Sequence, residues 1–293
     1  MSGILGIWHL DGRPVDRSEL TRLSATLLHR GSDDHGIWID ASAGLACRLA
    51  RITPESATEV QPVSDTSGAT LVFDGRLDNR DELLTALEDD SAVSRESPDS
   101  TLVLAAYRAF GDDAPSRLNG DFALGLFDPR RKQLLLARDA IGVRPLYYYA
   151  KGGLFLFASE IKTLLSHPRV ETGPNDNALA DFLFTRFAGE ETQEATFFQN
   201  IVSVRPAHAV IVRGPDTVRT HQYWDFDLTR EVRFGRFDDY AGAFRQHFEQ
   251  AVRRRLRSAA PVAMWYCRWL PSFMMAFTNT LSGTNVVNRP PPP

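Results

Sequence analysis

The sequence predicts an α+β fold with antiparallel sheets, because its strand-like segments come in neighbouring pairs joined by short turns. Apolar runs over residues 122–127 and 133–138 flank one such turn, and runs over residues 145–150 and 154–158 flank another. Turns of this length join antiparallel strands, whereas parallel strands need a crossover of a dozen residues or more. The predicted helices lie between groups of strands and do not alternate with them, which excludes a βαβ architecture.

Further strands extend this pattern on both sides of the two hairpins. Residues 44–49 and 69–73 are apolar and are bounded by Gly, Asp or Pro, as strands commonly are. Residues 209–212 and 217–223 form another pair around a Gly-Pro-Asp turn. The predicted sheets therefore extend to about residue 223.

Helices are predicted where capping residues precede apolar periodicity. Asp16 and Glu19 form a capping-box pattern at the start of a helix over residues 17–29. Ser97 and Pro98 supply an N-cap and a first helical residue for a second helix, which places Asp99 in its first turn. The other short helices are expected to start near Asn79, Ser159 and Asn175.

The last predicted helix covers residues 238–257 and carries one apolar stripe. Its apolar side chains recur every four residues, at Tyr240, Phe244, Phe248, Val252 and Leu256. A stripe of this kind needs a partner surface. Without one, we expect an exposed apolar face that is poorly ordered or prone to aggregation.

Residues 264–293 differ in composition from the rest of the chain. They contain no Asp, Glu or Lys, three of the four Met and two of the five Trp, and they end in four prolines. No helical or strand period continues through them. Two interpretations are open: sequence from another reading frame, which we favour, or a genuine tail that packs its aromatic residues on the domain.

Composition and charge exclude several classes of protein. The 293 residues are 43% hydrophobic and carry a net charge of -4, which gives no general footprint for nucleic acid. No apolar stretch of about 18 residues occurs, so no membrane span is expected. The two cysteines have no metal or redox spacing and fit a reducing compartment. The sequence thus predicts a cytoplasmic protein with neither nucleic-acid nor membrane partners.

A series of short motifs carries a resemblance to a known family. The motifs are Ser2-Gly3-Ile4, Leu28-His29-Arg30-Gly31-Ser32-Asp33, Arg48-Leu49, Asp74-Gly75, Pro98-Asp99, Leu118-Asn119-Gly120-Asp121-Phe122-Ala123, Ala137-Arg138-Asp139, Pro145-Leu146-Tyr147, Ala158-Ser159-Glu160-Ile161-Lys162 and Tyr223-Trp224. In this order and spacing they make residues 1–263 resemble the N-terminal part of glutamine-hydrolysing asparagine synthetases. The opening His9-Leu10-Asp11-Gly12-Arg13-Pro14 is also similar to asparagine synthetase-like enzymes such as lasso-peptide cyclases.

The resemblance implies a fold and a domain organisation. The N-terminal domain of that family is a class II glutamine amidotransferase, an N-terminal nucleophile hydrolase with a four-layer αββα sandwich. We therefore expect such a domain over residues 1–225, and a linker with the first helix of a synthetase domain over residues 226–263. Residues 264–293 are then an aberrant or disordered tail. The family's Ser-Gly-Gly-Leu-Asp-Ser loop, which holds ATP pyrophosphate, does not follow Ala263. ATP and Mg²⁺ are thus expected only in a synthetase domain missing here, and no cofactor or metal is expected in this chain.

The resemblance also implies a nucleophile position at Ser2, where the family has Cys. In the family, the processed N-terminal Cys attacks the glutamine side-chain amide and its own α-amine is the base. An α-amine with a pKa near ~8 and a thiol near ~8.5 suit this chemistry, whereas a hydroxyl is far harder to deprotonate. Unrelated N-terminal hydrolases do use Ser, so Ser2 makes efficient glutaminase activity doubtful without excluding hydrolysis.

The oxyanion position departs from the family as well. Family members present Asn-Gly, and this chain has Asp74 followed by Gly75. A carboxylate has no N–H to donate, and the loss of one oxyanion donor costs roughly 10²–10³ in rate. Arg76, which replaces the family's Glu, could neutralise Asp74 as an ion pair. An ordinary turn aspartate is the interpretation of Asp74 that the sequence favours.

Two residues match positions that recognise the ends of glutamine in the family. Arg48 matches the residue that binds the α-carboxylate, and Asp99 matches the residue that binds the α-ammonium. A structural strand role for Arg48 and a capping role for Asp99 remain open. Cys47 is expected to be an inert packing residue and His29 a residue of the helix end.

These observations predict a truncated, asparagine synthetase-related protein with a degenerate glutaminase site. The parent reaction implied by the resemblance is ATP-dependent formation of asparagine from aspartate and glutamine. Whether this chain is itself an enzyme is left open. The alternatives are a weak Ser-dependent glutaminase or a non-catalytic glutamine-binding scaffold, with a synthetase partner or a second copy as its binding partner.

Overall fold

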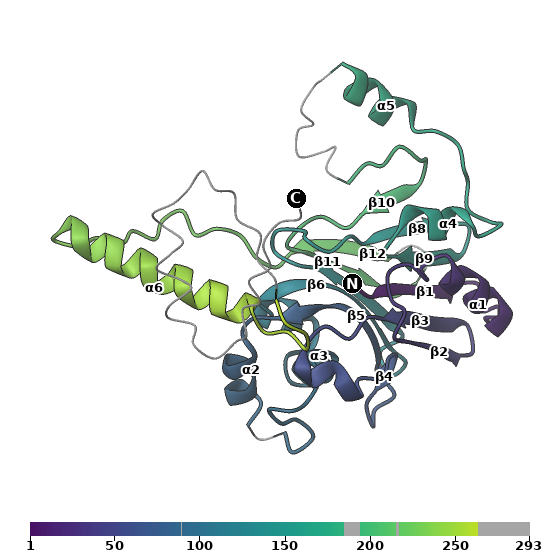
Figure 1. Ribbon diagram of the computed structural model, residues 1–293. Helices are drawn as coiled ribbons and strands as arrows, with labels where there is room; N and C mark the ends of the chain where they lie inside the picture. Colours follow the sequence, from purple (N-terminus) through teal and green to yellow (C-terminus); the bar gives the residue numbers. More distant parts are fainter. Residues whose placement is uncertain (89, 185–193, 215–216, 263–293) are drawn as a thin grey trace, which may run out of the picture.

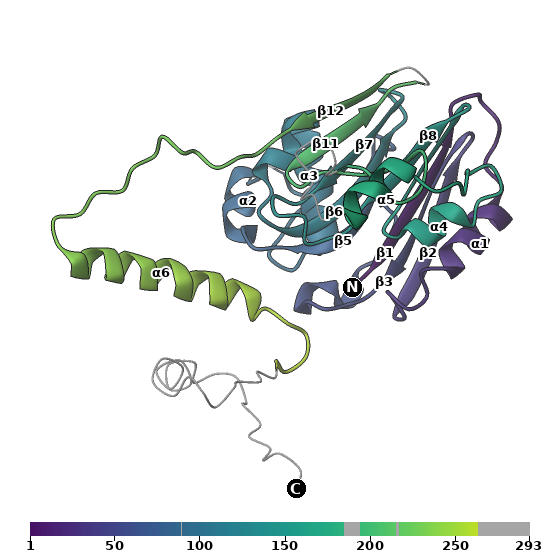
Figure 2. The same cartoon turned by 90° about the horizontal axis from the view of Figure 1, so that it is seen from above.

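The computed structural model of the chain describes residues 1–88, 90–184, 194–214 and 217–262. Two antiparallel sheets lie face to face at its centre (Figures 1 and 2). In the first sheet the strand order is β10 (Ile201–Ser203), β8 (Tyr147–Lys151), β9 (Leu154–Ala158), β1 (Gly3–His9), β3 (Ala43–Leu49) and β2 (Asp34–Asp40). In the second sheet it is β12 (Val218–Gln222), β11 (His208–Val212), β7 (Gln133–Arg138), β6 (Gly120–Asp128), β5 (Thr70–Leu77) and β4 (Val63–Ser64).

Helices cover the two outer faces of this pair of sheets. The first sheet is covered by α1 (Arg17–Ala25) and α4 (Ile161–Leu165), and the second by α2 (Arg80–Ala86) and α3 (Asp99–Phe110). The predicted α+β class and the four-layer αββα order are thus confirmed. The remaining helical segments of the sandwich region are η1 (Pro54–Thr58), η2 (Gly111–Arg117) and α5 (Asp176–Leu183).

Successive side chains of β5 (Thr70–Leu77) point to opposite faces of the sheet, so they pack into two different apolar cores. Val72 lies in the apolar cluster between the sheets, and Phe73 and Leu77 lie in the cluster under α3. Asp74 shares the face of Val72, so its carboxyl group points into the space between the sheets. This alternation brings a charged side chain into an otherwise apolar layer.

Strand β1 occupies the middle of the first sheet, although the sequence pattern did not predict it. Its two glycines, Gly3 and Gly6, interrupt the run of apolar residues that would otherwise indicate a strand. Gly6 is required by close packing, because a Cβ there would lie 2.3 Å from Cε1 of Phe157. The central position of β1 fixes the N-terminus of the chain beside β3 and β9.

Helix α6 (Phe237–Arg255) confirms the last predicted helix and projects away from the sandwich (Figures 1 and 2). Its C-terminal end lies near α2, where Arg254 forms an ion pair with Glu82. Phe237 and Phe244 on this helix are 83% and 67% exposed, as expected of an uncovered stripe. The expectation for residues 264–293 lies outside the described residues.

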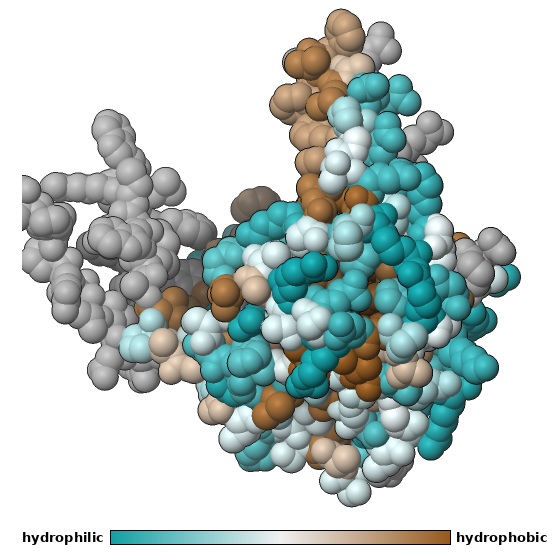
Figure 3. Space-filling view, turned by 90° about the vertical axis from the view of Figure 1, so that its right-hand side faces the viewer, coloured by the Kyte–Doolittle hydropathy of each residue, from teal (hydrophilic) through white to brown (hydrophobic). Residues whose placement is uncertain are grey.

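A second exposed apolar region lies at the end of α5. Figure 3 shows the projection at the top of the molecule coloured mainly as hydrophobic. Phe182, Leu183 and Phe184 are each at least 68% exposed there. This region lies on the side of the first sheet that carries β8 and β10.

Candidate functional site

Ser2 lies at the start of β1 and is almost fully buried. Its Oγ accepts a hydrogen bond from the backbone N–H of Ala50 at 3.1 Å. Its carbonyl oxygen accepts one from Nε of Arg30 at 2.8 Å. The residue at the predicted nucleophile position is therefore held at both its side chain and its backbone.

Arg30 connects Ser2 to Asp74 across the two sheets. Its Nη2 donates to Oδ2 of Asp74 at 2.9 Å, and both side chains are less than a tenth exposed. On the other side of the carboxylate, Nη1 of Arg144 lies 3.6 Å from Oδ1. Asp74 is thus a buried carboxylate between two guanidinium groups, directly beside the predicted nucleophile.

Two expectations about this position were wrong. Asp74 is not a turn residue, because it lies inside β5 and is paired with Ala123 of β6. Arg76 does not neutralise it: its guanidinium group contacts Asp78 and the backbone carbonyls of Arg254 and Arg255. The physical reason is that Asp74 already has two arginine partners between the sheets.

Burial and neighbouring charges act in opposite directions on the two titratable groups at this position. Burial raises the pKa of the Asp74 carboxyl group, and the charges of Arg144 and Arg30 act in the opposite direction. Burial also lowers the pKa of the Met1 α-amine, while Asp74 acts to raise it. An α-amine of Ser2 in the same surroundings would experience opposing effects: burial and the two arginines favour its neutral form, and the Asp74 carboxylate favours its protonated form.

Arg144 was not singled out in the sequence, although it directly precedes the Pro145-Leu146-Tyr147 motif. Its loop is fixed by Asp139, whose Oδ2 accepts the backbone N–H of Arg144 at 2.9 Å. Within the described residues, Nε and Nη1 of Arg144 are buried and have no hydrogen-bond acceptor. Nη1 lies within ion-pair distance of Asp74 but forms no hydrogen bond with it, so the charge of Arg144 acts on that carboxylate without a direct donor contact.

The free edge of β5 carries Gly75, the residue predicted to be an oxyanion donor. Phe73 exchanges two hydrogen bonds with the side chain of Gln61, and the N–H of Leu77 donates to Asp99. Residues two apart in a strand present their N–H and C=O groups to the same edge. The N–H of Gly75 therefore points to this edge, between Gln61 and Asp99.

Only glycine fits at position 75. A Cβ there would lie 2.4 Å from the carbonyl oxygen of Asp121 and 2.8 Å from Cα of Phe122, both on β6. The close approach of the two strands, and not a positive φ, imposes this requirement.

Asp99 lies on the same edge but is already fully engaged. Its carboxylate accepts from the N–H of Leu77 and from the guanidinium groups of Arg80 and Arg257. Helix α3 starts at Asp99, one residue later than Ser97 and Pro98 predicted. The carboxylate faces β5 instead of capping its own helix.

Arg48 lies in a different layer from Asp99. Its Nε donates to Oγ of Ser24 at 2.9 Å, so its side chain is directed toward α1. Its role as a carboxylate-binding residue stays a prediction. Arg51, which the sequence reasoning missed, follows Ala50 and has a buried Nε without a hydrogen-bond partner among the described residues. The other nitrogens of its guanidinium group donate to the carboxylate of Asp34 and to the backbone carbonyls of Asp33 and Glu59.

The two remaining expectations near the site concern Cys47 and His29. Cys47 is 1% exposed between the sheets, and burial raises the pKa of its thiol well above the usual value, which suits an inert packing residue. His29 is exposed and its Nε2 lies 2.7 Å from Oε1 of Glu160. It follows α1, which ends at Ala25, earlier than predicted.

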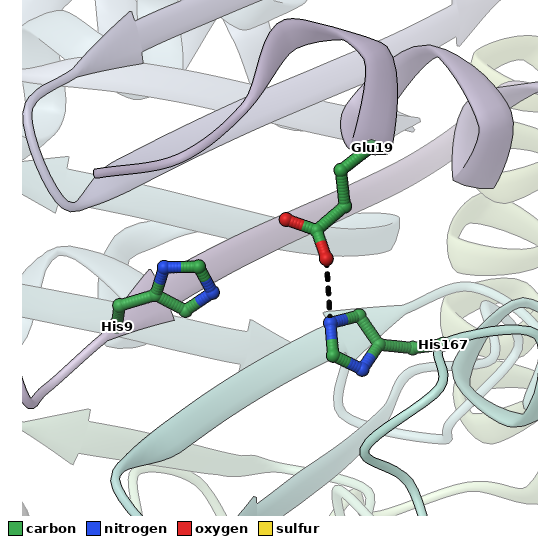
Figure 4. A group of neighbouring side chains, drawn as sticks. All are labelled: His9, Glu19 and His167. Carbon is green, nitrogen blue, oxygen red and sulfur yellow. Dashed lines mark ion pairs between the residues drawn. The ribbon is translucent and has the colours of Figure 1, made fainter. Parts of the chain in front are cut away.

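A separate group of His9, Glu19 and His167 lies beyond the opposite end of β1 (Figure 4). Nε2 of His167 is 2.8 Å from Oε1 of Glu19, and its Nδ1 accepts the backbone N–H of Arg169. A neutral imidazole that accepts at Nδ1 carries its proton on Nε2 and has no lone pair there for a metal. We therefore assign no metal to this group.

Within the part of the chain that the structure describes, no helix is both long and apolar enough to cross a membrane.

Comparisons with known proteins identify the family of this chain. A family model described as a glutamine amidotransferase domain matches residues 1–224. The chain is 30% identical over 261 residues to asparagine synthetase (glutamine-hydrolyzing) 3 of Bacillus subtilis strain 168, covering 88% of this chain and 41% of that protein. It is also 30% identical over 257 residues to amidase chry2 of Gibberella zeae, covering 85% of this chain and 37% of that protein. The chain thus spans about two fifths of the length of these relatives.

Solved structures share the fold. Glutamine phosphoribosylpyrophosphate amidotransferase from B. subtilis, complexed with ADP and GMP, matches 76% of this chain and 49% of its own with a TM-score of 0.51 and 18% identity. This likeness supports the N-terminal nucleophile type of sandwich. Together with the match over residues 1–224, it shows that the chain belongs to the glutamine amidotransferase domain family and is related to the asparagine synthetases.

Proposed function

We propose that this domain recognises the carboxamide side chain of glutamine but hydrolyses it slowly or not at all. The observation that carries the proposal is the buried Asp74 carboxylate, which takes the position of an uncharged oxyanion donor and is bound by Arg30. A negative charge at this position repels the oxyanion of the tetrahedral intermediate. The free N–H of Gly75 supports recognition of the amide oxygen.

The reaction that would be impaired can be written step by step. Oγ of Ser2 attacks the amide carbon, its proton passes to the α-amine, and the carbonyl electron pair moves onto oxygen. The C–N bond then breaks, the amine returns the proton to the leaving nitrogen, and ammonia departs. Water hydrolyses the resulting ester. Asp74 disfavours both the neutral amine of the first step and the oxyanion that this step forms.

A slow Ser-dependent glutaminase is the second candidate, and Arg144 is the observation that favours it. The buried Nε and Nη1 of Arg144 have no acceptor among the described residues, and Nη1 lies 3.6 Å from Asp74. A positive donor this close would offset part of the charge of Asp74 in the transition state.

In the parent reaction that we propose for the whole protein, ammonia from glutamine supports ATP-dependent amide formation. The proposal assigns no ATP- or Mg²⁺-dependent step to residues 1–262. It places that chemistry in a separate synthetase module, with which this domain would associate.

Ammonia release and calorimetric binding with glutamine separate the two candidates. Binding without ammonia above the enzyme-free blank supports the recognition domain. Ammonia release that disappears in Ser2→Ala supports the slow glutaminase. Absence of both binding and ammonia release, for glutamine and for its analogue without the α-amino group, would contradict recognition of the carboxamide.

A further inference from the structure

The guanidinium group of Arg257 closes the end of the β5 edge at Asp99. Nη2 donates to Oδ2 of Asp99 at 2.7 Å and to the carbonyl oxygen of Leu77 at 2.9 Å. Nη1 donates to Oδ1 of Asp99 at 3.3 Å and to Oε2 of Glu55 at 2.7 Å. The Arg257 side chain is only 19% exposed. Both oxygens of the carboxylate and the adjoining strand carbonyl are thus occupied from within the chain.

The surrounding charges reinforce this closure. Arg80 binds the same carboxylate from the other side. Arg76 holds the end of α6 by donating to the carbonyls of Arg254 and Arg255, where a cation suits the negative end of a helix. An ammonium group that approached Asp99 would meet three guanidinium groups and find no free acceptor on that carboxylate.

Arg257 binds at Leu77 and Asp99, and the distance from there to the N–H of Gly75 is one that a single small ligand could span. Gly75 and Leu77 are two residues apart on one edge, which is about 7 Å along an extended strand. A ligand whose carboxamide oxygen binds the N–H of Gly75 would carry its other end toward Leu77 and Asp99. In glutamine, that end bears a positive α-ammonium.

We propose that Arg257 determines substrate specificity in this domain, by excluding the α-ammonium of free glutamine. The site then favours primary carboxamides that lack a positive charge at the α-position. This class includes glutaramate, which is glutamine without its amino group, and N-acylated glutamine. The inference rests on the proposed recognition of the glutamine carboxamide and names the class of ligand that fits it.

Titration calorimetry with glutamine and with glutaramate tests the proposal on the full chain. The wild-type protein should bind glutaramate about tenfold or more tighter than glutamine, the difference expected for one unfavourable charge contact. Arg257→Ala should tighten glutamine binding about tenfold or more and leave glutaramate binding within about twofold. Arg257→Gln, which removes the charge with a smaller change in volume, should act in the same direction.

Arg245→Ala is the matched control, because Arg245 is an exposed arginine of helix α6 that does not line the pocket formed by Leu77, Arg80 and Arg257. It should change neither affinity. Thermal unfolding of each variant checks that the fold is retained. N-acetylglutamine, which keeps the carboxylate and loses the positive charge, should behave as glutaramate does.

The outcomes separate this inference from the proposed function. Two results would overturn the role of Arg257 while leaving carboxamide recognition intact. The first is that the wild type binds glutamine as tightly as glutaramate. The second is that neither Arg257 variant binds glutamine more tightly than the wild type does. Failure of every ligand to bind every variant would overturn carboxamide recognition and this inference with it.

Discussion

Asp74 is the side chain in which this domain differs most clearly from the family pattern. It is buried between the sheets and its two oxygens face two arginines, Arg30 on Oδ2 and Arg144 on Oδ1. A buried charge costs several kcal/mol of desolvation, which its partners offset only while all of them are present. Asp74 therefore affects the stability of the fold as well as the chemistry of the site.

Removing the carboxylate should destabilise the protein, because two buried guanidinium groups lose their counter-charge. We expect Asp74→Ala to lower the free energy of unfolding at pH 7 by about 3–5 kcal/mol, measured by urea denaturation. Asp81→Ala is the control, since the Asp81–Arg95 pair is 80% and 81% exposed and such pairs contribute little. Equal losses in the two variants would contradict a buried ion-pair network at Asp74.

The raised pKa of Asp74 predicts a pH dependence of the catalytic defect. Because burial raises this pKa, the carboxyl group takes up its proton at higher pH than an exposed aspartate does, and the protonated form can donate an O–H. In a Ser2→Cys background, the turnover advantage gained from Asp74→Asn should be largest at alkaline pH and shrink as the pH falls. Asp74→Asn also removes a charge that acts to raise the pKa of the neighbouring α-amine, so the amine titration of each protein is measured separately and the ratio is corrected for it. A ratio that is constant, or that grows toward acid, would show that protonation of Asp74 does not supply the donor.

Strand β5 organises the site at the level of the element. Its inward face carries Asp74, and its free edge presents Phe73, Gly75 and Leu77 in turn to Gln61, to the open site and to Asp99. The strand thus holds the reaction centre and the predicted recognition position at a fixed spacing. Packing against β6 maintains that spacing.

Gly75→Ala should disturb this strand, since its Cβ would lie 2.4 Å from backbone oxygen of Asp121. Overpacking of this kind costs about 1–3 kcal/mol, which thermal unfolding would detect as a lowered midpoint. Gly235→Ala is the matched control, because a Cβ at Gly235 meets nothing within 4 Å. An unchanged midpoint for Gly75→Ala would mean that β5 and β6 are less closely packed than described.

The elements differ in how well the sequence predicts them, for physical reasons. Hairpins such as β6 and β7 depend on local alternation and a short turn, so their signals lie within residues 120–138. Strand β1 was missed because Gly3 and Gly6 are required by close packing against residues far away in the sequence, among them Phe157. The closure of Asp99 by Arg257 joins residues 158 positions apart, and no local pattern encodes such a contact.

At the scale of the whole molecule, the four-layer fold places Ser2, Arg30, Asp74 and Arg144 together from four separate segments. The motifs predicted the fold, because family resemblance transfers a shared scaffold, whereas the turn interpretation favoured for Asp74 was wrong and the roles of Ser2 and Asp74 stay predictions. The resemblance did not predict which arginines bind Asp74, because family members have an uncharged residue at that position. Arg30 and Arg144 lie in recognisable motifs, but only the assembled sandwich brings them to one carboxylate.

The central claim is that oxygen at Ser2 and a carboxylate at Asp74 together suppress glutamine hydrolysis. It is tested most directly by ammonia release from glutamine at pH 7.5 in four proteins: wild type, Ser2→Cys, Asp74→Asn and the double variant, with removal of Met1 checked by mass spectrometry. We predict little or no release in the wild type and Asp74→Asn, and a double variant faster than Ser2→Cys by roughly 10²-fold, the effect of one oxyanion donor. A wild type as active as the double variant would contradict the account.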